Sequence, residues 1–263
     1  MLTINQYVRA ESLEQAYELC QKKRNVVLGG MLWLKMQHRN VETAIDLCDL
    51  GLDQITETSD SYTIGAMVSL RTLEQHAGLA ALTQGAFAEA LSHIVGVQFR
   101  NTATVGGSLF GRFGFSDVLT LFAVLDAKIE LYHHGMLSIA EFCALPRNTR
   151  DILVQVHVPK TQKRVVYLSQ RNSTTDFPVL TCAVALQDGN CQCAIGARPL
   201  EAMTFTDETG ILQNGITPES AAAFAQNIAQ KAEFGKDIRA GVEYRKRVCA
   251  VLVRRALLQA KEG

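Results

Sequence analysis

Two pairs of adjacent glycines, each directly after a short β-favouring run, constrain this chain more than any other feature. The first pair is Gly29-Gly30, after Val26-Val27-Leu28, and the second is Gly106-Gly107, after Thr104-Val105. Adjacent glycines let a backbone turn sharply and bring its N–H groups close to a ligand. Two such segments converging in space would suit the pyrophosphate of a dinucleotide. The sequence therefore predicts a protein that binds a nucleotide cofactor.

Composition excludes several classes of partner. The 263 residues carry 26 Lys and Arg against 26 Asp and Glu, so no basic surface for nucleic acid or anionic membrane is expected. No apolar run approaches the roughly 20 residues of a membrane-spanning helix, and the opening Met1 to Gln6 is unlike a signal peptide. Seven scattered cysteines are typical of reduced thiols in a cytoplasmic protein. Only Cys191 and Cys193 lie close together, so no metal site is predicted.

The order of hydrophobic patterns predicts an α+β protein. Helices are expected over 11–23 (capped by Ser12), 82–93, 116–125, 218–234 and 241–261. Strands are expected over 26–28, 44–47, 62–66, 129–132, 136–138, 152–158, 165–168, 179–186 and 191–197. Asp188-Gly189-Asn190 is a strong hairpin turn between the last two strands.

The polar, turn-rich segment 146–150 is the candidate boundary between two domains. We expect a first domain over 1–150, which carries both glycine pairs and divides into subdomains of about 1–57 and 58–150. The second domain, over 151–263, is expected to hold antiparallel strands followed by helices.

The glycine pairs do not match the common phosphate-binding motifs. Neither is G-x-G-x-x-G with an acidic residue at Rossmann spacing, and the Walker A lysine is absent, so a different fold is required. Taken alone, Gly29-Gly30 is better explained by a turn or a close helix–sheet approach than by a phosphate site. Arg100 and Asn101 precede the second pair, and Thr104 adds a hydroxyl. Asp117, ten residues on, either accepts from a ribose hydroxyl or caps a helix.

Longer stretches of the chain resemble one flavoprotein family. The segment Gln98 to Leu109, followed by Asp117 and by 121–127, is similar to the FAD-binding medium subunit of the molybdenum hydroxylases. This is the family of xanthine dehydrogenase and carbon monoxide dehydrogenase. Segment 62–70 resembles the part between the family's two glycine loops, and 236–245 resembles its closing-helix signature. The similarity runs in the expected order over nearly the whole chain.

The resemblance implies a fold, a cofactor and partners. The fold would be a two-subdomain FAD-binding domain of the vanillyl-alcohol-oxidase-like type, followed by a smaller domain of antiparallel sheet plus helices. The chain would be a cytoplasmic oxidoreductase subunit that binds FAD. It would assemble with a molybdopterin-binding large subunit and a [2Fe-2S] small subunit. The flavin would take electrons from the iron–sulfur subunit and pass them to NAD, oxygen or another acceptor.

The resemblance also implies which positions contact the cofactor. They are Leu28, Gly29, Gly30, Met31, Leu32, Trp33, Asn101, Thr104, Val105, Gly106, Gly107, Ser108, Asp117 and Arg171.

The chain departs from the family pattern at some of these positions. Met31-Leu32 stands where the family has small polar residues, and Ser108 replaces the usual Asn. Segment 110–115 is rich in Phe where the family has Ala, Ser and Pro, and Arg171 is the cation nearest the family's usual lysine. These departures leave a second hypothesis, a flavin-deficient structural subunit of the same complex. A stand-alone flavin oxidase is disfavoured, because little chain remains beyond the cofactor domain to form a substrate cavity.

Overall fold

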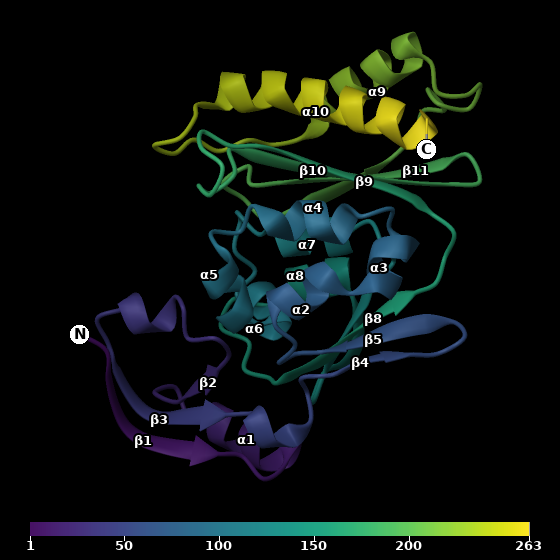
Figure 1. The fold of residues 1–263 in the computed structure, drawn as a ribbon. Coiled ribbons are helices and arrows are strands. Elements are labelled where there is room, and N and C mark those ends of the chain that lie inside the picture. The colour runs from purple at the N-terminus through teal and green to yellow at the C-terminus, as the bar shows by residue number, and fades with distance from the viewer. Residues whose placement is uncertain (263) are drawn as a thin grey trace. The chain divides into compact units, whose positions relative to one another are not determined.

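The computed structural model describes residues 1–262, which form two compact units (Figure 1). Unit 1 consists of residues 1–73, 97–111 and 126–160, and unit 2 consists of 74–96, 112–125 and the chain from 161 onward. The chain thus passes from one unit to the other several times. The helix α2 (Leu70–Gln75) contains the first of these passages.

The N-terminal part of unit 1 is a three-stranded parallel sheet. Its order is β1 (Thr3–Arg9), β3 (Asn40–Asp46), β2 (Val26–Leu28). The helix α1 (Leu13–Cys20) connects β1 to β2, and its cap Ser12 accepts a hydrogen bond from the Gln15 N–H at 3.1 Å. Two short 3₁₀ helices follow, η1 (Leu34–Met36) and η2 (Cys48–Leu50). Apolar side chains of α1 and β3 form one small core with strand residues of the second sheet in this unit.

The second sheet of unit 1 has five antiparallel strands. Its order is β4 (Ile55–Glu57), β5 (Ser61–Gly65), β8 (Leu153–Pro159), β6 (Lys128–Leu131), β7 (Gly135–Ser138). Three helices of six residues belong to this unit as well: α5 (Val97–Thr102), α6 (Val105–Phe110) and α8 (Ile139–Ala144). Both glycine pairs therefore lie in unit 1.

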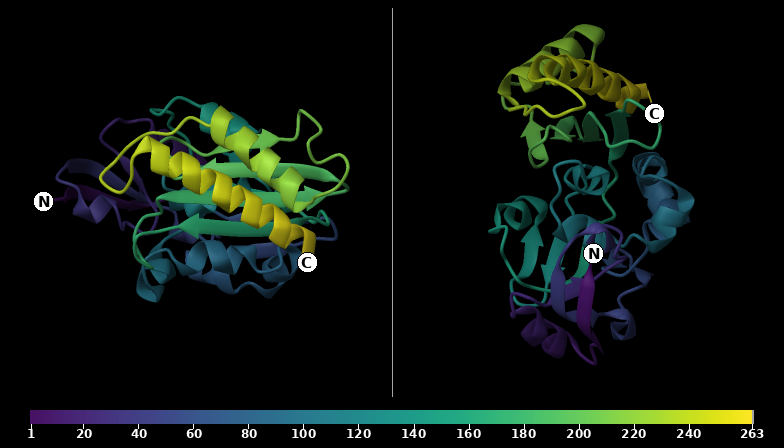
Figure 2. Two further views of the ribbon diagram at one scale, coloured as in Figure 1. Left: turned by 90° about the horizontal axis from the view of Figure 1, so that it is seen from above. Right: turned by 90° about the vertical axis from the view of Figure 1, so that its left-hand side faces the viewer.

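Unit 2 is built on a four-stranded antiparallel sheet. Its order is β12 (Met203–Thr206), β11 (Asn190–Gly196), β10 (Leu180–Gln187), β9 (Arg164–Gln170). The helices α9 (Pro218–Lys231) and α10 (Val242–Glu262) cover one face, and α4 (Ala86–Ser92) and α7 (Asp117–Phe122) contact the strands from the other (Figures 1 and 2). The helix α3 (Ala77–Leu82) packs beside α4. The main core of this unit lies between the sheet and the pair α9–α10.

The predicted α+β class is confirmed, with differences in individual elements. The helix expected to begin at Leu82 begins at Ala86 as α4, because Gln84 and Gly85, with left-handed φ angles of 49° and 85°, separate it from α3, which ends at Leu82. The second glycine pair, expected in a loop, lies in the first turn of α6, because the side chain of Thr104 caps that helix. The N–H groups of Val105, Gly106 and Gly107 in this first turn all donate to acceptors within the protein.

Arg150 fixes the segment proposed as the domain boundary. Its guanidinium donates to three carbonyl oxygens at the end of α1 and just beyond it, those of Cys20 at 2.6 Å, Lys22 at 2.9 Å and Lys23 at 2.8 Å. Segment 146–150 is therefore tied into unit 1, which continues to residue 160. The division of the chain into domains near residue 150 stays a prediction. None of the helices within residues 1–262 is long and apolar enough to cross a membrane.

Candidate functional site

The first glycine pair begins a row of unused hydrogen-bond donors. The strand β2 ends at the buried Leu28, and the next four residues are half-buried. Within residues 1–262, the N–H groups of Gly29, Gly30, Met31 and Leu32 donate to no protein atom. Met31 has a φ of 57°, in the left-handed region that non-glycine residues seldom adopt. Successive N–H groups around such a residue form the concave arrangement that binds anions.

The second glycine pair is held by the residues on either side of it. The Thr104 hydroxyl caps α6 and accepts from the Gly107 N–H at 3.2 Å. The Val105 and Gly106 N–H groups donate to the carbonyl oxygens of Val68 at 2.9 Å and Ala66 at 2.8 Å. The Val105 side chain is fully buried and packs in the core, and its N–H group already has an acceptor. Val105 therefore anchors the glycine pair and offers no donor to a ligand.

The two glycine pairs meet in space, as the sequence predicts. A Cβ atom on Gly29 would lie 2.7 Å from Thr104 Oγ1 and 3.6 Å from Gly107 Cα. A Cβ atom on Gly30 would lie 2.0 Å from the Thr102 carbonyl oxygen. The backbone contact leaves no room for a side chain at Gly30, and a side chain at Gly29 would displace the Thr104 hydroxyl that caps α6. The Trp33 and Phe99 rings, with centroids 6.1 Å apart, make a second contact between the same stretches.

Gly107 differs from the other three glycines. It is exposed, and a Cβ atom built on it would meet only Thr104 Oγ1, at 3.1 Å, within 4 Å. Packing within the chain therefore does not require glycine here, whereas a ligand approaching the backbone would. The surroundings fit a diphosphate: unused N–H donors of the first segment lie beside an open glycine of the second. These donors belong to the backbone. The apolar side chains of Met31 and Leu32, which replace the family's small polar residues, therefore leave the donors in place.

Two other predicted positions of unit 1 have different surroundings. Asn101 is exposed on α5, and its side chain is accessible to a ligand. The Ser108 hydroxyl donates to the Thr104 carbonyl oxygen at 2.9 Å, one turn back along α6. Ser108 thus stabilises the helix that carries the glycine pair.

Asp117 and Arg171, both in unit 2, form a buried ion pair. Arg171 Nη2 donates to Asp117 Oδ1, and the Tyr167 hydroxyl donates to the same oxygen. Arg171 also donates from Nη1 to the Asp176 carbonyl oxygen at 2.6 Å and from Nε to Ser169 Oγ at 3.2 Å. Burial raises the pKa of the Asp117 carboxyl, and the Arg171 guanidinium acts against that shift. Ser116, not Asp117, caps α7.

Sequence reasoning did not identify Tyr167 as a partner of this pair. The signal was present, because Tyr167, Ser169 and Arg171 recur every second residue and therefore share one side of an extended chain. Nor did it indicate the left-handed conformation of Met31, which no local pattern marks. Within residues 1–262, no group of three or more His, Cys, Asp or Glu side chains is placed to hold a metal ion.

Comparisons with known proteins agree with this geometry. Residues 3–161 match the family model described as the FAD binding domain in molybdopterin dehydrogenase. Over 260 residues the chain is 28% identical to the uncharacterized protein YgfM of Escherichia coli K12, covering 95% of this chain and 94% of the relative.

The similarity to a relative named for its activity and to a solved structure extends over most of the chain. The carbon monoxide dehydrogenase medium chain of Afipia carboxidovorans is 26% identical, over 87% of this chain and 84% of its own length. The structure of quinoline 2-oxidoreductase from Pseudomonas putida 86 superposes with a TM-score of 0.85 at 19% identity, covering 98% of this chain and 96% of that one. The family match covers more than half of the chain and confirms the resemblance seen in the sequence. The chain belongs to the family of FAD-binding domains of molybdopterin dehydrogenases.

Proposed function

We propose that this chain is the electron-transferring FAD subunit of a molybdopterin-dependent hydroxylase or dehydrogenase complex. The single observation that carries the proposal is the contact between the two glycine pairs, with the unused N–H groups of residues 29–32 beside the open Gly107. This arrangement suits a pyrophosphate, which carries about two negative charges and needs oriented donors once water is displaced. The bound flavin would supply the ability to accept electrons singly and release them in pairs.

The chain's own residues would divide the work of binding. Backbone N–H groups from Gly29 to Leu32 would bind the diphosphate, with Leu28 and Trp33 at the ends of that segment. Thr104, Val105, Gly106 and Ser108 would hold Gly107 in place for the same group. Asn101 would contact the cofactor from α5. Asp117 and Arg171 stay predicted contacts from unit 2, where their ion pair would keep both side chains in fixed positions.

The partners and the acceptor are part of the proposal. We infer that electrons arrive from a [2Fe-2S] small subunit, which receives them from a molybdopterin-binding large subunit. They would leave to NAD or another acceptor. The described medium-chain relative is named as part of such a dehydrogenase. We also infer a cytoplasmic location, because all seven cysteines are free thiols.

Purification of the tagged full chain from its own cells tests the assembly. We expect the chain to co-purify with molybdenum, iron and FAD, measured by elemental analysis and by the visible spectrum. Flavin reoxidation after rapid mixing of the reduced complex with NAD⁺ would identify NAD as the acceptor. A complex that contains molybdenum and iron but no FAD would support the flavin-deficient structural subunit instead. A chain that carries FAD without either metal would contradict the proposed partners.

A further inference from the structure

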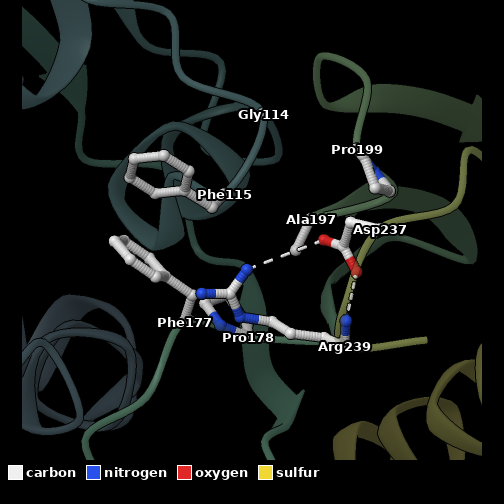
Figure 3. A pocket seen from close by; sticks show the side chains of 8 residues that line it. All are labelled: Gly114, Phe115, Phe177, Pro178, Ala197, Pro199, Asp237 and Arg239. Carbon is white, nitrogen blue, oxygen red and sulfur yellow. Dashed lines mark hydrogen bonds and ion pairs between the residues drawn. The ribbon is translucent and has the colours of Figure 1, made fainter.

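A separate pocket lies entirely within unit 2, where the loop before α7, the loop before β10 and the segment before α10 meet (Figure 3). Its volume is about 170 Å³. Phe115, Phe177, Pro178, Ala197 and Pro199 supply apolar walls. Gly114 and two charged residues, Asp237 and Arg239, complete the lining. Neither the glycine pairs nor the Asp117–Arg171 ion pair lines this pocket.

The guanidinium of Arg239 is the unusual group in the lining. It lies over the Phe177 ring, with its Cζ atom 4.8 Å from the centroid, and the side chain is 23% exposed. Its closest acidic contacts are Nε to Asp176 Oδ1 at 3.6 Å and Nη1 to Asp237 Oδ2 at 3.8 Å. Both distances exceed hydrogen-bond length, and within residues 1–262 no acceptor hydrogen-bonds this guanidinium.

The acidic neighbours are already engaged elsewhere. Asp237 Oδ1 accepts from the N–H groups of Arg239 at 2.8 Å and Ala240 at 3.2 Å, and from the guanidinium of Arg245. Arg245 is fully buried, and it also donates to the carbonyl oxygens of Val179 and Ala197. Asp176 Oδ1 accepts from the Phe177 N–H at 2.7 Å. Arg245 counters the charge of Asp237, whereas Asp176 keeps its ion pair with Arg239. The guanidinium of Arg239 therefore offers a ligand N–H donors that no acceptor among the described residues uses.

A ligand that fits this pocket must suit both its apolar walls and the guanidinium of Arg239. An arginine presents donors in a fixed planar fork that matches a carboxylate. A pocket of about 150 Å³ with apolar walls holds a single benzene ring. The Phe115 and Phe177 rings, with centroids 4.4 Å apart and planes at 54°, are the aromatic part of the lining that such a ring would contact. Figure 3 shows the guanidinium between Phe177 and Asp237, with Phe115 on the same side as Phe177.

We propose that this pocket binds a small aromatic carboxylate, of the size of benzoate, with its carboxylate on Arg239 and its ring against Phe115 and Phe177. None of the residues of this pocket belongs to the proposed pyrophosphate site at the two glycine pairs. Binding of the carboxylate is therefore expected without FAD. Inorganic phosphate is a poorer match, because the apolar walls would be left in contact with water or with a strongly hydrated ion.

The test is a ¹⁹F NMR titration of 4-fluorobenzoate against the full chain, with 4-fluorobenzamide as the neutral ligand of the same shape. We expect saturable binding of the acid with a dissociation constant of about 1 mM or below, as for a ligand of this size. The amide is expected to bind at least about tenfold more weakly, because it cannot use the charge of Arg239. Equal binding of acid and amide, or no saturable binding of the acid, would overturn the proposal.

Variants separate this site from other cations on the surface. Arg239→Gln is expected to weaken binding of the acid at least about tenfold, and Arg239→Lys to weaken it less. Arg255→Gln, the same change at an exposed position of α10, is the matched control and is expected to change nothing. An unchanged dissociation constant in Arg239→Gln contradicts the proposal, as does displacement of the acid by equimolar phosphate. If Arg239→Gln fails to fold, the comparison of acid with amide on the unaltered protein decides. The visible spectrum of the same samples reports FAD separately.

Discussion

Gly106 and Gly107 are neighbours in α6, yet a methyl group on each would meet different surroundings. On Gly106 it would lie 2.9 Å from both the Cβ and the carbonyl oxygen of the buried Ala66. On Gly107 it would meet only the tip of the Thr104 side chain. The first glycine is required by packing within the protein, and the second is required only if a ligand approaches the backbone.

Substitutions at these two glycines should therefore separate stability from FAD binding. Gly106→Ala is expected to lower the free energy of unfolding by about 1–3 kcal/mol, because backbone and Cβ atoms must shift. Gly107→Val is expected to abolish FAD retention while changing the stability of the FAD-free protein by less than about 1 kcal/mol. Urea unfolding and titration with FAD, followed by flavin fluorescence, measure the two quantities. Retained FAD with an unchanged dissociation constant in Gly107→Val would show that this segment is not the site.

We expect the buried thiol of Cys191 to lower the free energy of unfolding as the pH rises into the alkaline range. Burial raises the pKa of this thiol to about 12, whereas a thiol in an unfolded chain ionises near pH 8.5. Since the folded value is the higher one, the stabilisation is present below about pH 8.5 and is lost as pH rises toward 12. Between pH 8 and 10 the loss from this one thiol should be about 1–2 kcal/mol.

Urea unfolding at pH 6, 8 and 10 checks that sign. Cys191→Ala should lose less stability than the unaltered protein between pH 8 and 10, and the two should respond alike between pH 6 and 8. An equal loss in both proteins between pH 8 and 10 would contradict the assigned shift.

The two glycine pairs also show how far the sequence predicts the site at this scale. Adjacent glycines after β-favouring residues indicate the phosphate segment, and Thr104 is recognisable as a hydroxyl beside it. The φ of 57° at Met31 could not be predicted, because it depends on how residues 29–34 pack on the small core around Val41 and Ala44. In the sequence, Met31 in place of the family's small polar residue therefore suggests the loss of a phosphate contact. In the structure the backbone N–H donors of this segment remain.

Among the elements, Arg150 joins the end of α1 to the segment before β8. Its three hydrogen bonds go to the carbonyl oxygens of Cys20, which ends the helix, and of Lys22 and Lys23 beyond it, where intrahelical donors run out. Arg150→Ala is expected to lower the free energy of unfolding by about 1–3 kcal/mol, because charged hydrogen bonds to these acceptors are lost. Arg24→Ala, an exposed neighbour in the same unit, is the control and should change it by less than about 0.5 kcal/mol.

Chemical denaturation of both variants measures this difference. Equal effects of Arg150→Ala and Arg24→Ala would show that the contact does not hold the segment in place. Arg150→Lys should recover only part of the loss, because an ammonium group cannot reach three carbonyl oxygens as a planar fork does.

Elements with strong local signals were predictable, and those set by distant contacts were not. Ser12 and the hydrophobic spacing after it locate α1, and Asp188 and Gly189, both with left-handed φ angles, locate the turn between β10 and β11. The strand β1 was missed, because it is an edge strand whose residues are almost all exposed and show no alternation. The interruption at Gln84 was missed as well, because only the following glycine marks it.

The two units of the molecule are built from segments that alternate along the chain. Segments 74–96 and 112–125 belong to unit 2, although both lie within the first 150 residues. A division read from composition and turn-rich segments is linear along the chain, and the boundary near residue 150 stays a prediction. The resemblance of Gln98 to Leu109 to one family indicated the fold, which composition and turns alone did not.

The visible spectrum of the purified full chain tests the central claim most directly. We expect flavin absorption bands corresponding to about one FAD per chain, or uptake of added FAD at micromolar concentration to the same level. The bands should be lost in Gly107→Val and kept in Gly241→Ala, since a Cβ atom at Gly241 meets nothing within 4 Å. A folded, unaltered chain that shows no flavin bands and takes up no added FAD would contradict the account.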